Sequence, residues 1–141
     1  MKALMAILLA SLLALGCSNQ PRKDSDDKVA AALDQLEMRP SEQPVRIRDY
    51  QVDSWRYIDR ENLIVETSAN DQYLVSLRTS CFGLQSAFAV GFTSAGGSVD
   101  KFEDILVRDS SGRTERCPIS EIVKLEKLEN AARTRCRVGL Y

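Results

Sequence analysis

An alternation of apolar and polar side chains begins at Val45, and it is the pattern of antiparallel strands that bury one face. In residues 72–78 this alternation predicts that Tyr73, Val75 and Leu77 face the core. The connections between the apolar runs are too short for parallel crossovers, so we expect a meander. The strands expected in this part of the chain are 45–48, 55–58, 63–67 and 72–78.

The next part of the chain combines a mixed segment with a hairpin. Residues 82–86 favour a helical turn, and residues 87–93 favour a strand because their apolar side chains alternate. Farther along, the apolar runs 102–108 and 114–119 flank a turn in which Gly112 can take a positive φ without strain. This pattern predicts a β-hairpin.

A helix is expected on each side of the strands, and the first one precedes them. Val29, Leu33 and Leu36 fall on one helical face, which predicts a short helix over residues 27–38. The prolines at positions 40 and 44 break this pattern and mark the boundary of the folded domain. Docking on the domain, fraying and contact with a partner all stay open for this helix.

The second expected helix follows the hairpin. Pro118 lacks an N–H for the ladder, so we expect it at an edge or at the end of a strand. Ser120 then resembles an N-cap, which predicts a C-terminal helix through residue 132. Its apolar strip consists of Ile122, Leu125 and Leu128.

The N-terminus has the pattern of a targeting segment. Lys2 is followed by an apolar run at 3–15, which has the length of a signal peptide and is shorter than a spanning helix. The run ends in Leu-Ala-Leu-Gly-Cys, which resembles the lipobox of bacterial lipoproteins, with Cys17 as the residue that receives the lipid. An ordinary secretory signal is the alternative, because Ala14 and Gly16 also satisfy the small-x-small rule for cleavage.

A lipid on Cys17 has consequences for location. Acyl chains such as palmitate would anchor the protein to a membrane that it does not cross. Ser18 stands where an Asp would be the retention signal of the inner membrane in enteric bacteria. By that resemblance we expect the protein in the outer membrane, facing the periplasm.

Together these patterns predict a mainly β chain of the α+β class. The expected fold is a small antiparallel β-sheet or partly open barrel with a C-terminal helix, preceded by a signal peptide and a flexible tether that includes the polar residues 18–28. The expected parts are a signal peptide at 1–16, the lipidated Cys, tether and short helix at 17–44, a β-rich domain at 45–132 and a flexible tail at 133–141.

Charge and cysteine content narrow the classes of partner and compartment. The 19 basic and 20 acidic residues give a net charge of −1, which argues against nucleic acid and against a polybasic membrane contact. If Cys17 of the four cysteines carries lipid, three remain in an oxidising compartment. Cys81 and Cys117 end apolar segments, whereas Cys136 lies in an arginine-rich tail, so pairing of the first two is favoured and two separate buried thiols are the alternative.

A family resemblance rests on residues of the central region. They are Trp55 with Ile58 and Asp59, the run 73–77, Cys81 with Gly83 and Leu84, the run 102–107, and Cys117, Pro118 and Ile119 leading into Ile122. Over roughly residues 47–125 the chain resembles a family of small proteobacterial lipoproteins whose shared domain has no assigned function. The resemblance implies a compact β-rich domain with a disulfide between Cys81 and Cys117.

Candidate chemistry is sparse. The sequence has no His, which removes the usual general base and every Ser-His or Cys-His nucleophile pair. Asp59 with Glu61 and Glu103 with Asp104 are the carboxylates that a hydrolase could use, although charges of turns and solvated faces explain them better. We therefore predict no catalytic, cofactor-binding or metal-binding residue.

The aromatic residues have two interpretations. As the largest apolar groups of a small domain they are expected to fill its core, and Trp55 and Tyr57 are the candidates for lining a ligand groove instead. The aromatics in question are Trp55, Tyr57, Tyr73, Phe88, Phe92 and Phe102. The function expected from the whole sequence is a non-enzymatic interaction or envelope-assembly module with a possible envelope protein partner. A lipid-binding or cell-wall ligand-binding domain and a His-free carboxylate hydrolase are the alternatives.

Overall fold

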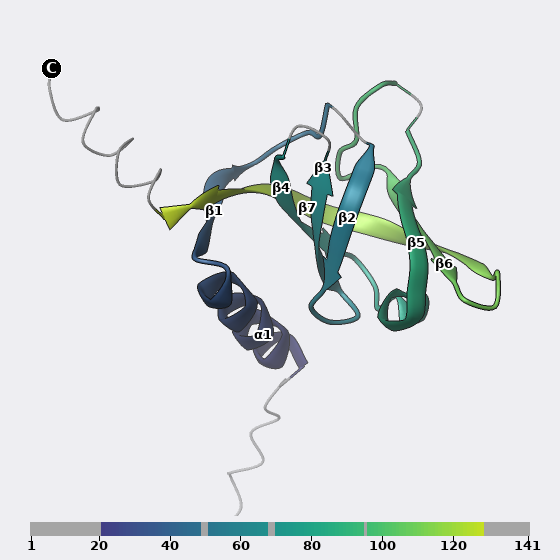
Figure 1. The fold of residues 1–141 in the computed structure, drawn as a ribbon, viewed down its shortest axis with the longest axis horizontal. Coiled ribbons are helices and arrows are strands. Elements are labelled where there is room, and N and C mark those ends of the chain that lie inside the picture. The colour runs from purple at the N-terminus through teal and green to yellow at the C-terminus, as the bar shows by residue number, and fades with distance from the viewer. Residues whose placement is uncertain (1–20, 49–50, 68–69, 95, 129–141) are drawn as a thin grey trace, which may run out of the picture.

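The computed structural model describes residues 21–48, 51–67, 70–94 and 96–128 (Figure 1). These residues form strands that curl into a nearly closed barrel, with one long helix on the N-terminal side. The elements are α1 (Pro21–Gln35), β1 (Met38–Pro44), β2 (Val52–Tyr57), β3 (Asn62–Thr67), β4 (Gln72–Leu77), the 3-10 turn η1 (Phe82–Ser86), β5 (Ala87–Phe92), β6 (Asp104–Asp109) and β7 (Thr114–Lys127). The expected β-rich, partly open barrel is confirmed.

The long strand β7 organises the sheet. The strand order is β2-β3-β4-β7-β6-β5 with antiparallel pairing throughout. On one side β7 pairs with β4, and on the other it pairs first with β6 and then with β1, which reaches Lys127. β2 and β5 are thus the two ends of this path, β1 lies off it as a further edge strand, and the side chains of Val52, Trp55, Ala87 and Phe92 from β2 and β5 pack against the core.

The sheet buries side chains on both faces. The inner face of the barrel holds the larger core. Its buried residues are Ile47, Leu63, Val65, Tyr73, Val75, Leu77, Cys81, Leu84, Val90, Val99, Ile105, Val107, Cys117, Ile119 and Ile122. Tyr73, Val75 and Leu77 therefore face the core as expected. On the outer face Ile64, Leu74 and Leu125 form a second cluster with Leu33 and Met38.

The outer cluster shows what α1 does. Leu33 is buried there, and Val29 and Leu36 pack against it, so the expected helical face is confirmed and the helix docks on the barrel. The helix begins earlier than expected, at Pro21, where a proline suits the first turn because its missing N–H has no partner in a helix. The expectation of a disordered tether up to Lys28 is therefore wrong for residues 21–28.

The segment between helix and barrel is also ordered. Residues expected only to break the helical pattern form β1, whose prolines are tolerated because β1 is an edge strand with an interrupted register between Pro40 and Pro44. The strand expected at 45–48 is reduced to a single bridge between Ile47 and Val99. The sheet thus starts before the domain boundary that the prolines suggest.

The expected C-terminal helix is wrong over residues 120–127, which belong to β7. The register of β4 against β7 shifts between Ser76 and Leu77, which marks a bulge in β7 near Ser120. The bulge moves the inward-facing position from Ile119 to Ile122, and Leu125 is buried on the opposite face, under α1. The bulge, together with burial on both faces of β7, therefore gives the apolar residues of this strand a spacing that resembles that of a helix.

The other expectations for this part of the chain have mixed outcomes. The turn at 82–86, the strand after it and the β6–β7 hairpin are confirmed, and Gly112 has a φ of 83° at the hairpin turn. In that turn the Ser111 hydroxyl donates to the Asp109 carboxylate at 2.6 Å and lowers the pKa of Asp109. Pro118, however, lies inside β7, where its carbonyl accepts from the Arg78 N–H one residue past β4, so its missing N–H interrupts no ladder.

Candidate functional site

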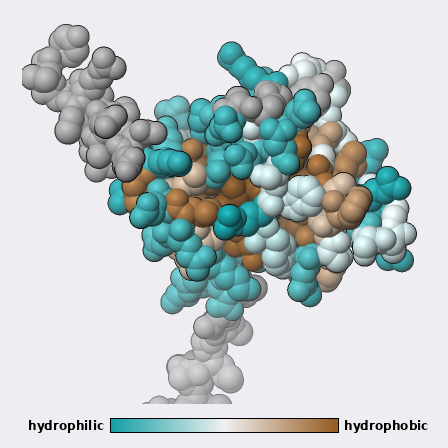
Figure 2. Space-filling model, in the orientation of Figure 1, coloured by the Kyte–Doolittle hydropathy of each residue, from teal (hydrophilic) through white to brown (hydrophobic). Residues whose placement is uncertain are grey.

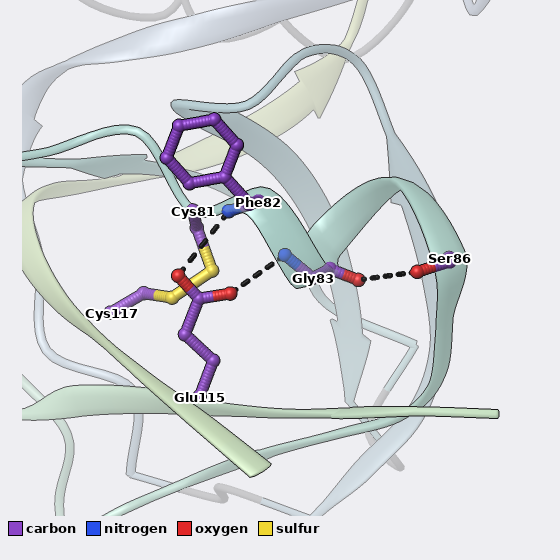
Figure 3. The surroundings of a disulfide bond; sticks show 6 residues. All are labelled: Cys81, Phe82, Gly83, Ser86, Glu115 and Cys117. Carbon is purple, nitrogen blue, oxygen red and sulfur yellow. Dashed lines mark hydrogen bonds between the residues drawn. A yellow bond between two sulfur atoms is a disulfide. The ribbon is translucent and has the colours of Figure 1, made fainter. Parts of the chain in front are cut away.

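The predicted disulfide between Cys81 and Cys117 is confirmed. The two residues are 36 positions apart, their Cα atoms are 5.8 Å apart, and both side chains are buried. Figure 3 shows that the bond connects the start of η1 to β7. The Cys81 N–H also donates to the Arg60 carbonyl at 2.8 Å, so η1 is held against the β2–β3 turn as well.

A carboxylate beside the disulfide fixes the first turn of η1. Glu115 accepts hydrogen bonds from the N–H groups of Gly83 at 2.7 Å and of Phe82 at 3.3 Å (Figure 3). A Cβ at position 83 would lie 2.9 Å from Glu115 Oε2, so this carboxylate would have to shift to admit a side chain. The two hydrogen bonds hold the backbone at Phe82 and Gly83, while the Phe82 ring points away from the disulfide.

The same group is the nearest approach to a metal site in the described part of the chain. Cys81, Glu115 and Cys117 bring three potential ligand atoms within 4.8 Å of one another. Both sulfur atoms are bonded to each other, and the carboxylate caps η1, so their bonding capacity is already used. The three residues therefore have a structural role, which is to hold η1 against β7.

One end of the barrel carries exposed aromatic side chains, and we call it the η1 end, defined by Tyr57, Arg60, Phe82 and Phe88. Phe82 and Phe88 are 67% and 74% exposed, and Tyr57 is more than a third exposed. The Arg60 guanidinium carbon lies 5.0 Å from the centre of the Phe82 ring. Figure 2 shows apolar side chains among polar ones on the face that carries β2 and β5.

The expectation that the aromatics fill the core is thus wrong for Phe88 and Phe102. Phe88 is the additional residue of a bulge, because Ala87 pairs with Asp109 and Ala89 with Arg108, and the bulge turns its side chain outward. Phe102 precedes β6 and is 75% exposed. Tyr73 is buried and Phe92 packs partly against the core.

The two candidate ligand-facing aromatics lie in different surroundings. Trp55 pairs with Val65 on β3 and packs partly against the inner core, at the edge of the sheet. Tyr57 lines a surface groove of about 450 Å³, which we call the α1 groove. Its lining residues are Asp24, Ser25, Lys28, Tyr57, Asp59, Arg60, Glu61 and Gln85.

A second groove, the β7 groove, lies where the edge of β7 passes from β6 to β1. It has a volume of about 400 Å³ and combines apolar and charged side chains. Its lining residues are Pro44, Val45, Arg46, Asp100, Lys101, Phe102, Ser120, Glu121 and Ile122. Phe102 stands at its rim with Lys101 Nζ 5.3 Å from the ring centre, and Arg46 pairs with Asp100 at 3.4 Å.

Three of the four candidate carboxylates, those of Asp59, Glu61 and Glu103, take part in structural hydrogen bonds. Asp59 accepts from the Ser25 hydroxyl at 2.7 Å and from Asn62 Nδ2 at 3.1 Å, and Glu61 accepts from the Ser80 hydroxyl at 2.8 Å. Glu103 accepts from Thr93 Oγ1 at 3.2 Å. Sequence reasoning missed the bond between Ser25 and Asp59, which latches α1 onto the barrel, because no spacing rule relates residues so far apart.

The remaining predicted residues, Cys17 and Cys136, lie outside the described residues. In the part of the chain that the structure describes, we find no helix with the length and apolar character needed to span a membrane.

The described residues thus define a small, nearly closed β-barrel that contains a buried disulfide and carries surface grooves and exposed phenylalanines. Residues 1–137 match the model of a family of unknown function, DUF6491, and the chain belongs to that family. No curated protein and no solved structure matches the chain. The expected membership of an uncharacterised, disulfide-containing family is confirmed at this level.

Proposed function

We propose that the protein is a lipoprotein of the bacterial envelope that binds another envelope protein without catalysing a reaction. A lipid on Cys17 would attach it to the outer membrane, with the barrel in the periplasm. The lipobox-like segment supports the attachment. The disulfide supports an oxidising compartment, because such bonds persist there and are rare in the cytosol.

The exposed side chain of Phe102 at the rim of the β7 groove is the observation that carries the binding role. A phenylalanine in water keeps most of its apolar surface available, and aromatic side chains next to a pocket are typical anchors of protein interfaces. The groove lies along β7 between β6 and β1, so its shape suits an extended segment that inserts an apolar side chain beside Phe102. Arg46, Asp100 and Glu121 supply charges around it.

The hydrogen bonds of the candidate carboxylates favour binding over hydrolysis. Asp59 and Glu61 hold the β2–β3 turn and α1, and Glu103 holds the loop before β6. A glycosidase needs two carboxyl groups that face one substrate across a cleft. The bonds made by these side chains leave them in structural roles.

The attachment is tested by replacing Cys17 with alanine. We expect the Cys17→Ala variant to leave the membrane fraction or to accumulate as an unprocessed precursor, because no acyl chain can then hold it. Cell fractionation with immunoblotting and intact-mass analysis measure both outcomes. Cys136→Ala is the matched control and should stay in the membrane fraction. Correctly processed Cys17→Ala protein that stays membrane-bound would contradict the lipid anchor.

The binding role is tested by photo-crosslinking in cells. A photoreactive phenylalanine analogue at position 102 should yield one defined protein adduct, identified by mass spectrometry, because this ring stands at the groove. Ser120→Arg, which places a long charged side chain at a residue that lines the groove, should reduce the adduct at least tenfold. The analogue at Phe88 is the control at the opposite end of the barrel. An adduct of the same protein at both positions, or one unaffected by Ser120→Arg, would remove the groove from the proposal.

A further inference from the structure

We infer that the η1 end of the barrel rests on the lipid bilayer, with Phe82 and Phe88 in the interface between headgroups and acyl chains. This inference rests on the proposed lipid anchor at Cys17 and adds an orientation and a second contact. Three observations carry it: the short distance along the chain from Cys17 to α1, the position of α1 beside the η1 end, and the chemistry of that end.

The first observation is the reach of the chain. Only three residues separate Cys17 from Pro21, where α1 begins. A fully extended chain covers at most about 3.6 Å per residue, so the Cα atom of Pro21 lies within about 14 Å of that of Cys17. A lipid on Cys17 therefore keeps the start of α1 close to the membrane surface.

The second observation is what the start of α1 contacts. Ser25 donates to Asp59 at 2.7 Å and accepts from Asn62 Nδ2 at 2.8 Å, which latches the first turns of the helix to the β2–β3 turn. Lys28 of α1 and Gln85 of η1 line the same α1 groove. In Figure 1 the start of α1, the β2–β3 turn and the turn before β5 lie on one side of the molecule. The anchor thus brings the η1 end to the bilayer.

The third observation is the chemistry of the η1 end. On surfaces that lie in the membrane interface, Trp, Phe and Leu side chains enter the apolar boundary while Lys and Arg keep their charges with the headgroups. Phe82 with Arg60 has this arrangement, and exposed Phe88 and Tyr57 extend it. The α1 groove is lined by three carboxylates and only two cations, so the contact depends on the apolar rings rather than on a net positive charge.

The backbone of this end is also held in place. The disulfide, the Glu115 carboxylate and the bond from Cys81 to Arg60 all fix the segment that carries Phe82. An aromatic side chain on a fixed backbone loses little conformational freedom on insertion, which favours contact with the bilayer.

The opposite end provides an internal control. Phe102 is as exposed as Phe82 and also has a cation over its ring. Phe102 lies before the start of β6, whereas Phe88 of the η1 end lies beside Asp109 at the other end of that strand. Residues of α1 line the groove at the η1 end, whereas no residue of α1 is among those that line the β7 groove beside Phe102. A general affinity of exposed phenylalanines for lipid would act at both ends.

The experiment uses the lipidated full-length protein in vesicles of phosphatidylethanolamine and phosphatidylglycerol whose acyl chains carry nitroxide labels near the headgroups. Phe82→Trp and Phe102→Trp are each made in a Trp55→Phe background, so that each protein has one reporter. We expect nitroxide to quench the Phe82→Trp fluorescence at least threefold more than that of Phe102→Trp. Disulfide mapping and circular dichroism confirm that both variants are folded.

The outcomes separate this inference from the proposed anchor. Protein that fails to co-sediment with unlabelled vesicles, or that lacks the acyl mass, contradicts the anchor itself. Protein that co-sediments but shows equal quenching at both positions, or stronger quenching at position 102, overturns the orientation alone. A defined protein adduct from a photoreactive analogue at Phe82 in cells, without quenching in vesicles, assigns the η1 end to a protein partner and also overturns it.

Discussion

Replacing Cys81 and Cys117 together with alanine is expected to lower the free energy of unfolding by about 2–4 kcal/mol. The bond closes a loop across 36 positions and so restricts the unfolded chain, and it also joins η1 to the central strand β7. Both sulfur atoms are buried in the inner core, so the double variant additionally loses packing. Denaturation in urea, followed by circular dichroism, measures the change.

Two controls make this result specific to the disulfide. Cys136→Ala should leave the unfolding midpoint unchanged, because Cys81 and Cys117 are bonded to each other. Wild-type protein treated with a dithiol reductant should unfold at nearly the midpoint of the double variant. Equal midpoints for oxidised wild type and the double variant would mean that the bond does not stabilise the barrel.

Replacing Ile122 with alanine is expected to destabilise the protein by about 2–5 kcal/mol, the usual range for removing a large aliphatic side chain from a core. Ile122 is only 1% exposed and pairs with Val75 on β4, in the inner core. The loss combines the transfer free energy of the removed carbons with the cavity that they leave. Urea denaturation of purified protein gives the value.

The neighbouring residue supplies the matched control. Glu121 is exposed, so Glu121→Ala should change the stability by no more than about 0.5 kcal/mol. The difference between the two variants is expected only if residues 120–127 belong to β7, because the bulge in this strand places Ile122 rather than Glu121 on the inward face. A small effect of Ile122→Ala together with a large effect of Glu121→Ala would contradict the observed register.

The proposed arrangement gives the two ends of the barrel different tasks. The η1 end would meet the membrane through Phe82, and the β7 groove would receive a partner beside Phe102. The β5–β6 hairpin separates the two sites, since Phe88 and Phe102 lie near its opposite ends. Such a protein would hold its partner at a set distance from the bilayer, which is a role compatible with an assembly or scaffolding step in the envelope.

Local signals in the sequence were sufficient for most of the strands. Alternation predicted β4 and its inward-facing positions, a run of residues that favour strands predicted β3, and Gly112 with its polar neighbours predicted the β6–β7 turn. The disulfide followed from the positions of Cys81 and Cys117 at the ends of apolar runs and from the family resemblance. These features depend on residues close together in the chain or on the few cysteines available.

Two features depend on contacts between distant segments: residues 120–127 form part of β7 rather than a helix, and α1 docks on the barrel. The spacing of Ile122 and Leu125 fits a helix, but a bulge and burial on two faces produce the same spacing in a strand. The latch between Ser25 and Asp59 joins segments 34 positions apart, and nothing local relates them.

Local patterns were thus enough to predict a β-rich chain with an amphipathic helix before it and to favour one pair of cysteines, because periodicity and turn chemistry act over a few residues. The tertiary structure alone decided which phenylalanines are exposed. The bulge at Phe88 and the late start of β6 after Phe102 depend on pairing with distant strands, and that pairing turns both rings to the surface.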